Sequence, residues 1–347
     1  ALLAAVRERA RHLRYSSADT MLVTNPLFHL NGQGSIIGCL AVRARVVLRE
    51  KFSASRFWQD VERHRVTTLN GMQTIPRILL AGEPRPGDRS SSLETVVGIL
   101  SADLHRAFED RFGVRFVQVY SLTEDPLSVM GPRDGLPAAW SAKLGAAGLP
   151  LAPDAHQIRI VDDDGRDLPA GMVGEIVKRS PATMTGYFRD PTATALALRD
   201  GWLYTGDSGL LDEDGFLYVV GRKKDAIRRP GEMIAAAEVE AALASHPGIA
   251  EVAVIGVPDP IRSEEVKVFV VLADGYTEDS LPPAQILAYC AERLAPFKIP
   301  RYLEYRGDLP KTATLKIRKE SLRALAEARS ADVYDRDQMP GVAAGAF

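Results

Sequence analysis

The sequence is poor in the features that mark disulfide-rich, metal-binding and membrane proteins. Only two of its 347 residues are cysteines, Cys39 and Cys290, and they lie in apolar stretches far apart in the chain. This spacing excludes a disulfide framework and a cysteine-based metal site, and it favours a reducing, cytoplasmic location. No run approaches the roughly 18 consecutive apolar residues that a membrane-spanning helix needs, and the first residues lack the apolar core of a signal peptide.

An excess of charge of either sign is also missing. Lys and Arg together number 43 against 45 Asp and Glu, which leaves a net charge of -2. We therefore expect no nucleic-acid partner and no anionic-membrane partner, and we expect a small molecule to be recognised through local groups. Hydrophobic residues make up 46% of the chain, enough for a sizeable core, and its length exceeds one average domain. Assembly as a homodimer is left open.

Strand and helix patterns alternate through the first 120 residues. Strands are predicted at 20–24, 45–48, 67–70, 96–99 and 115–120, and helices at 1–14, at 53–64 with Ser53 as its cap, and at 101–112 with Gly113 as its stop. Repeated strand–helix units predict a parallel sheet covered by helices, with ligands bound beyond the carboxyl ends of the strands. From Gly145 onward the strands shorten and turns multiply, which predicts a small β region. One of these turns, at 162–165, has three aspartates but lacks the ligand alternation of a Ca²⁺ loop.

The chain changes character again after Asp225. Helices are predicted at 234–245 and 284–294, and strands at 252–257, 266–272 and 302–305. This pattern predicts a compact α+β unit within the ordinary size range of a domain. We therefore expect a large α/β domain over 1–224, a small α+β domain over 225–330 and a loosely ordered tail over 331–347.

Two polar groups flank a short alternating segment, 216–220, that is predicted to be a strand. Asp207, in the run Thr205-Gly206-Asp207, can only accept hydrogen bonds when ionised, which suits the vicinal hydroxyls of a ribose. Arg222, in the run Gly221-Arg222-Lys223-Lys224-Asp225, supplies several donors in a fixed fork. Either run alone is typical of a turn or a solvated loop. Together, and in this order, they indicate a nucleoside ligand.

This stretch resembles the core signature of the adenylate-forming superfamily, which includes acyl-CoA synthetases, luciferases and peptide-synthetase adenylation domains. The resemblance runs from about Thr24 to about Leu322. It implies the adenylate-forming fold, with a layered α/β large domain, a small β region and a separate C-terminal α+β domain. Within the superfamily the chain is most similar to crotonobetaine/carnitine-CoA ligases, through Phe57-Trp58, Phe112-Gly113-Val114, Ile261-Arg262, Phe269-Val270-Val271-Leu272 and Phe297-Lys298-Ile299-Pro300.

The loop after the strand at 115–120 supplies three groups suited to a nucleotide. Tyr120 offers a flat face to a base, Thr123 a hydroxyl to a phosphate oxygen and Glu124 a hard oxygen ligand to Mg²⁺. A polar loop after a core strand is the alternative interpretation, but the matching loop of the family has these three roles. Ser121 stands where the family has glycine, so a positive φ at this position would strain the binding site.

Other roles follow from the resemblance alone. His29, in Pro26-Leu27-Phe28-His29, matches a motif that lines the acyl pocket, and Asp225 matches a hinge about which the small domain rotates. Lys316 matches the lysine that reaches the substrate carboxylate and the α-phosphate. Gly231 and Glu232 lie where the family passes CoA. Pro230 and Leu315 depart from the family's usual residues beside these positions.

The implied activity is that of an AMP-forming acyl-CoA synthetase, which uses ATP, Mg²⁺ and coenzyme A to activate a carboxylic acid. Members also carry a Ser/Thr/Gly-rich phosphate loop ending in Pro-Lys-Gly, and nothing before residue 26 resembles it. We therefore expect the chain to match the C-terminal two-thirds of such an enzyme, either as a shortened chain or as a natural remnant. The alternative function is a non-catalytic nucleotide- or CoA-binding module derived from the family.

Overall fold

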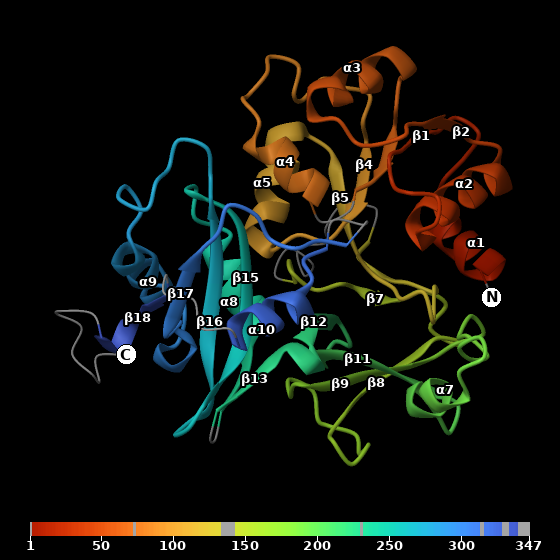
Figure 1. Ribbon diagram of the computed structural model, residues 1–347. Helices are drawn as coiled ribbons and strands as arrows, with labels where there is room; N and C mark the ends of the chain where they lie inside the picture. The colour runs from red at the N-terminus through yellow and green to blue at the C-terminus, as the bar shows by residue number, and fades with distance from the viewer. Residues whose placement is uncertain are drawn as a thin grey trace. The chain divides into compact units, whose positions relative to one another are not determined.

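The computed structural model describes residues 2–71, 74–132, 143–229, 232–312, 316–327 and 333–338 (Figure 1). The chain forms two compact units, residues 1–219 and 220–347. The division falls inside strand β12 (Leu217–Arg222), five residues ahead of the division expected between 224 and 225. The position of the functional boundary at Lys224–Asp225 stays a prediction.

The first unit is built on a seven-stranded sheet in the order β2-β1-β3-β4-β5-β6-β7. Its first five strands pair in parallel, which confirms the predicted parallel sheet. The strands are β1 (Thr20–Val23), β2 (Arg45–Leu48), β3 (Thr68–Asn70), β4 (Thr95–Gly98) and β5 (Arg115–Tyr120), followed by the antiparallel β6 (Val129–Met130) and β7 (Leu149–Pro150). The helices are α1 (Leu2–His12), α2 (Leu30–Val42), α3 (Ala54–His64), α4 (Thr74–Ala81) and α5 (Ala102–Phe112).

Helices cover both faces of this sheet (Figure 1). On one face α3, α4 and α5 pack on the strands around three aromatic rings, with Phe108 4.7 Å from Phe112 and 5.5 Å from Phe116 between ring centroids. Gly113 ends α5 as predicted, with a φ of 67°. Ser53 precedes α3 as predicted, but the expected side-chain cap is wrong because its hydroxyl makes no hydrogen bond to the helix backbone.

A second, five-stranded sheet follows, in the order β10-β11-β9-β8 with β12 beside β11. Its strands are β8 (Gln157–Val161), β9 (Gly174–Arg179), β10 (Leu198–Arg199) and β11 (Trp202–Leu211), and α7 (Pro191–Ala197) precedes β10. The turn predicted at 162–165 is present, since the Gly165 amide donates to the Asp162 carbonyl oxygen. This sheet is the predicted small β region, and it carries Asp207 on β11.

The second unit is an α+β domain with an apolar core on each face of its sheet. A hairpin of β13 (Ala226–Arg229) and β14 (Glu232–Ala235) precedes α8 (Ala236–Leu243), and the four-stranded sheet has the order β15-β16-β17-β18. The remaining elements are β15 (Ile249–Asp259), β16 (Ser263–Leu272), α9 (Pro283–Ala291), β17 (Tyr302–Tyr305), α10 (Lys319–Glu327), β18 (Val333–Asp335) and the short 3₁₀ segments Lys223–Asp225, Pro296–Lys298 and Arg336–Gln338.

Two predictions for this unit are corrected. The helix expected at 234–245 begins at Ala236, because residues up to Ala235 pair with β13 instead. The loose tail expected over 331–347 is wrong for Val333–Asp335, which pair with β17, and Arg301 donates to the Asp335 carboxylate at 3.1 Å. Residues 339–347 lie outside the described residues. None of the helices in the described ranges is long and apolar enough to cross a membrane.

Candidate functional site

The structure brings Tyr120 and Asp207 together, although 87 residues separate them in the sequence. The Tyr120 hydroxyl donates to Asp207 Oδ2 at 2.8 Å, and both residues are buried. Tyr120 is the last residue of β5, at the carboxyl end of the parallel sheet, where open α/β sheets bind their ligands. An aromatic ring and a carboxylate therefore lie side by side at this edge.

Asp207 is presented by an irregularity in β11. The register with β9 shifts between Tyr204 and Ser208, so the residues between them form a bulge. The Thr205 hydroxyl donates to the Ile176 carbonyl oxygen at 2.7 Å and accepts from the Asp207 amide at 3.1 Å. Gly206 has a φ of 68°, a left-handed conformation that favours glycine. Thr205-Gly206-Asp207 is therefore a bulge inside a strand, and the alternative of a free turn is wrong.

Two further predicted site residues, Thr123 and Glu124, lie in the loop after β5. Thr123 is exposed, and half-buried Glu124 accepts a hydrogen bond from the Tyr187 hydroxyl at 3.0 Å. The φ of Ser121 is not positive, so a serine in place of the family's glycine causes no backbone strain at this position. Glu124 forms no ion pair with a described cationic side chain, and this leaves its charge available to a hard cation.

Sequence reasoning missed a buried ion pair beside these groups. Asp125 and Lys178 are both fully buried, with Lys178 Nζ 3.6 Å from Asp125 Oδ1. Burial lowers the pKa of Lys178 to about 8, against the opposing influence of Asp125 and Asp207. The sequence signal was slight, since Lys178 interrupts the apolar run Ile176-Val177 of β9 and Asp125 is one more acidic residue in a polar loop.

His156, just before β8, completes this buried group and was also missed. Its Nδ1 lies 3.3 Å from the Leu151 carbonyl oxygen, and its buried Nε2 has no hydrogen-bond partner among the described residues. Burial, with the charge of Lys178 as the next cause, lowers the pKa of His156 to about 4. The ring is therefore neutral near pH 7.

His29 caps α2 and is half-buried. Its side chain accepts from the Asn31 amide at 3.0 Å, so it has a local structural contact, and its place in an acyl pocket stays a prediction.

The remaining predicted residues belong to the second unit. Arg222 ends β12 with an exposed side chain, and Asp225 accepts from Arg323 at 2.7 Å. Lys316 is exposed, and its carbonyl oxygen accepts from the Thr312 amide at 2.8 Å. Glu232 starts β14, where only its backbone is described. Gly231, Pro230 and Leu315 lie outside the described residues.

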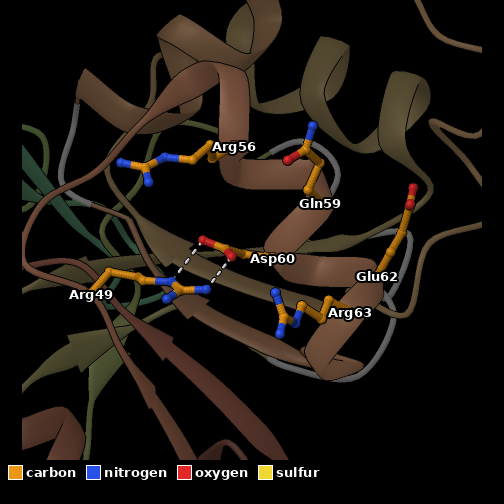
Figure 2. A pocket seen from close by; sticks show the side chains of 6 residues that line it. All are labelled: Arg49, Arg56, Gln59, Asp60, Glu62 and Arg63. Atoms are coloured by element: carbon orange, nitrogen blue, oxygen red, sulfur yellow. Dashed lines mark hydrogen bonds and ion pairs between the residues drawn. The ribbon is translucent and has the colours of Figure 1, made fainter.

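One other feature of the described residues carries no assigned role. A hollow of about 640 Å³, seen in Figure 2, is lined by side chains of both signs and by none of the predicted site residues: Arg49, Arg56, Gln59, Asp60, Glu62 and Arg63. Arg49 Nε donates to Asp60 at 2.9 Å, so part of its charge is already compensated. Within the described ranges, no group of three or more His, Cys, Asp or Glu side chains is arranged to hold a metal ion by itself.

Two family models match the chain. The model of the AMP-binding enzyme matches residues 1–188, and that of the AMP-binding enzyme C-terminal domain matches residues 238–316. The crotonobetaine/carnitine–CoA ligase of Shigella sonnei (strain Ss046) is 38% identical over 312 residues, which cover 88% of this chain and 59% of that ligase. The chain thus spans about three-fifths of the length of the curated relatives it matches.

Solved structures of adenylate-forming enzymes have the same fold. The o-succinylbenzoate CoA synthetase from Bacillus subtilis, in complex with its acyl-adenylate intermediate, matches with a TM-score of 0.82 and 31% identity over 95% of this chain and 65% of that one. ATP-bound MatB from Rhodopseudomonas palustris matches with a TM-score of 0.83 and 28% identity over 94% of this chain and 64% of that one. These matches confirm the predicted fold class, and together with the first family model, which covers more than half of the residues, they establish that the chain belongs to the family of AMP-binding enzymes.

Proposed function

We propose that this chain acts as an ATP-dependent acyl-CoA synthetase that joins a carboxylic acid to coenzyme A through an acyl-adenylate. The observation that carries the proposal is the contact between Tyr120 and Asp207 at the carboxyl end of β5. A flat ring beside an acceptor-only carboxylate suits a base and the vicinal hydroxyls of its ribose. The names of the relatives, which are CoA ligases, support a CoA thioester as the product.

The chemistry has two steps. A carboxylate is a poor acyl donor because oxide would have to leave, so its oxygen first attacks the α-phosphorus of ATP. This forms the acyl-adenylate and releases pyrophosphate. The CoA thiol, as its proton is lost, then attacks the acyl carbon, forms the thioester and releases AMP. The protein contributes mainly by positioning the reactants and stabilising phosphoryl charge.

The first unit supplies the groups for the nucleotide. Tyr120 and Ser121 line the base, Asp207 accepts from the ribose hydroxyls, and Thr123 donates to a phosphate oxygen. Glu124 would hold Mg²⁺, which fits because its half-buried carboxylate pairs with no described cation. When bound, Mg²⁺ would neutralise charge on the phosphates.

In this proposal the second unit supplies the lysine that stabilises charge at the reacting atoms, together with the residues for CoA and for the hinge. The ammonium of Lys316, exposed on a flexible stem, would reach the carboxylate and the α-phosphate. Arg222 would add donors at the ribose, and Gly231 and Glu232 would border the path of CoA. Rotation at Asp225 would separate the two half-reactions, because a few residues can absorb the change in φ and ψ.

The acid is proposed only as a class. A small or medium carboxylic acid is expected, with a carnitine-like betaine or a fatty acid as candidates, and His29 would line its pocket. The betaine is favoured by the names of the curated relatives. A cytoplasmic location and a homodimer stay predictions.

ATP–pyrophosphate exchange by this chain, measured with a panel of carboxylic acids, tests the proposal. Exchange with one acid should fall by roughly 10²–10³ in Lys316→Ala, the scale of losing one transition-state charge stabiliser. An absence of exchange with every acid, together with saturable binding of AMP or CoA, would favour the alternative of a nucleotide- or CoA-binding protein without ligase activity. The departures at Pro230 and Leu315 are the observations that favour this alternative.

A further inference from the structure

Lys178 is a fully buried lysine that the proposed reaction does not use. It lies on β9, whose neighbour β11 carries Asp207, and Leu203 of β11 is its direct partner in the ladder. Burying an ammonium costs several kcal/mol unless it is well paired. A buried lysine therefore needs compensating contacts. Here those contacts connect Lys178 with Tyr120 and Asp207, the proposed nucleotide-binding residues.

The ammonium is held by residues 125–127, which directly follow Thr123 and Glu124 in the loop after β5. Lys178 Nζ donates to the Leu127 carbonyl oxygen at 2.9 Å and to the Asp125 carbonyl oxygen at 3.3 Å. The Asp125 carboxylate is held in turn by Ser180 Oγ at 3.0 Å and Thr183 Oγ1 at 2.9 Å. These bonds tie the residue directly after Glu124 to β9 and to the turn that follows it.

The same ammonium faces the Tyr120 ring. Lys178 Nζ lies 5.6 Å from the centroid of that ring, within the range of a cation–π contact. The Tyr120 hydroxyl donates to Asp207, and Asp207 also interacts electrostatically with Lys178. Lys178 thus contacts the proposed base-binding ring and interacts with the proposed ribose-binding carboxylate.

The positive charge of Lys178 acts on several buried groups around it. Asp125 on the loop, Asp207 on β11 and neutral His156 before β8 are the titratable groups that interact with Lys178, together with the Tyr120 ring. Without Lys178, the buried carboxylates of Asp125 and Asp207 would lose the ammonium that interacts with both. The single ammonium partly offsets the charge of both carboxylates and lies beside the Tyr120 ring.

We propose that Lys178 is a positioning residue for nucleotide binding, whose buried ammonium supports the Tyr120 ring and, through the Tyr120 hydroxyl, the placement of Asp207 at the proposed ribose site. The inference rests on the proposed function, because it assumes that Tyr120 and Asp207 bind the nucleotide. It assigns a role to a residue that contacts no reacting atom.

AMP affinity and resistance to urea, measured on three variants of this chain, test the inference. Lys178→Met leaves buried Asp125 unpaired, Asp125→Asn keeps the ammonium, and the double variant removes both charges. A purely structural ion pair predicts that AMP affinity follows stability, so that the double variant regains both. The inference predicts that the double variant regains stability but binds AMP roughly tenfold more weakly, the scale of one desolvated cation–π contact, because the Tyr120 ring has lost its ammonium partner. Asp125→Asn should keep wild-type affinity while losing stability.

The outcomes separate the inference from the proposed function. Wild-type affinity in the stable double variant, or weakened binding in Asp125→Asn that matches its loss of stability, would overturn the role of Lys178. Failure of the wild-type chain to bind AMP, or unchanged binding in Asp207→Ala, would overturn the proposed function and the inference with it. Should Met fail to pack at position 178, Lys178→Gln combined with Asp125→Asn provides a second neutral pair for the same comparison.

Discussion

Acidification should destabilise the first unit through one buried histidine. His156 is 1% exposed and lies close enough to Lys178 for the two side chains to interact electrostatically. Because the Leu151 carbonyl oxygen can only accept, His156 Nδ1 carries the proton of the neutral ring, and a second proton would have to enter a buried site beside an ammonium. The perturbation is His156→Asn, which keeps a side-chain N–H for Leu151 but cannot be protonated in this range.

The magnitude follows from the pKa of the imidazole in the two states. The ordinary value is 6.5 and the folded value is about 4. Because the folded pKa is depressed, the unfolded chain binds the proton first as the pH falls. The contribution of His156 is therefore fully present above pH 6.5 and is lost progressively toward pH 4. This linkage removes about 2 kcal/mol from the free energy of unfolding at pH 5.0, and about 3 kcal/mol at pH 4.

Urea denaturation at pH 7.5 and pH 5.0 measures the effect. All three tryptophans lie before residue 220, so their fluorescence reports on the first unit. Other carboxylates lower the stability of both proteins in acid, so the wild type should lose about 2 kcal/mol more than His156→Asn between the two pH values. Any cavity left by the smaller side chain lowers the variant's free energy of unfolding equally at both pH values. Equal losses in the two proteins would refute the reasoning.

Two further predictions concern the backbone and the second unit. Gly148→Ala should abolish folding of the first unit, because Gly148 has a φ of 126° and an added Cβ would lie 2.0 Å from the Met130 carbonyl group. Soluble yield and circular dichroism measure this, with Gly171→Ala, at a positive φ in open space, expected to cost only about 1 kcal/mol. Arg229→Met should destabilise the second unit by roughly 3 kcal/mol, because it removes the main partner of fully buried Glu265 and leaves half-exposed Arg262 at 2.9 Å. Hydrogen exchange of the β16 amides measures this loss, and protection that is no lower than in the exposed neighbouring variant Arg228→Met would contradict it.

Much of the fold could be predicted from the sequence because its signals are local. The strands at 20–24 and 115–120 are rich in β-branched, aliphatic and aromatic residues, and the helix at 101–112 repeats apolar side chains every four residues before a glycine stop. These patterns depend only on neighbouring residues, and the alternation of strands and helices then predicts the parallel sheet. One error arose where a distant partner decided the structure, at Val333–Asp335, which form a strand by pairing with β17.

The same distinction between local signals and distant contacts holds for the candidate site. The sequence by itself determined which chemical groups are available, because the order of Tyr120, Glu124, Asp207, Arg222 and Lys316 is a property of the chain. Only the tertiary structure decided which of them meet. A bulge in β11 presents Asp207 to Tyr120 across 87 residues, and the packing of β9 against the loop after β5 buries Lys178 beside Asp125. A lysine in a strand and an aspartate in a loop carry no local sign of burial, since burial depends on contacts between segments far apart in the chain.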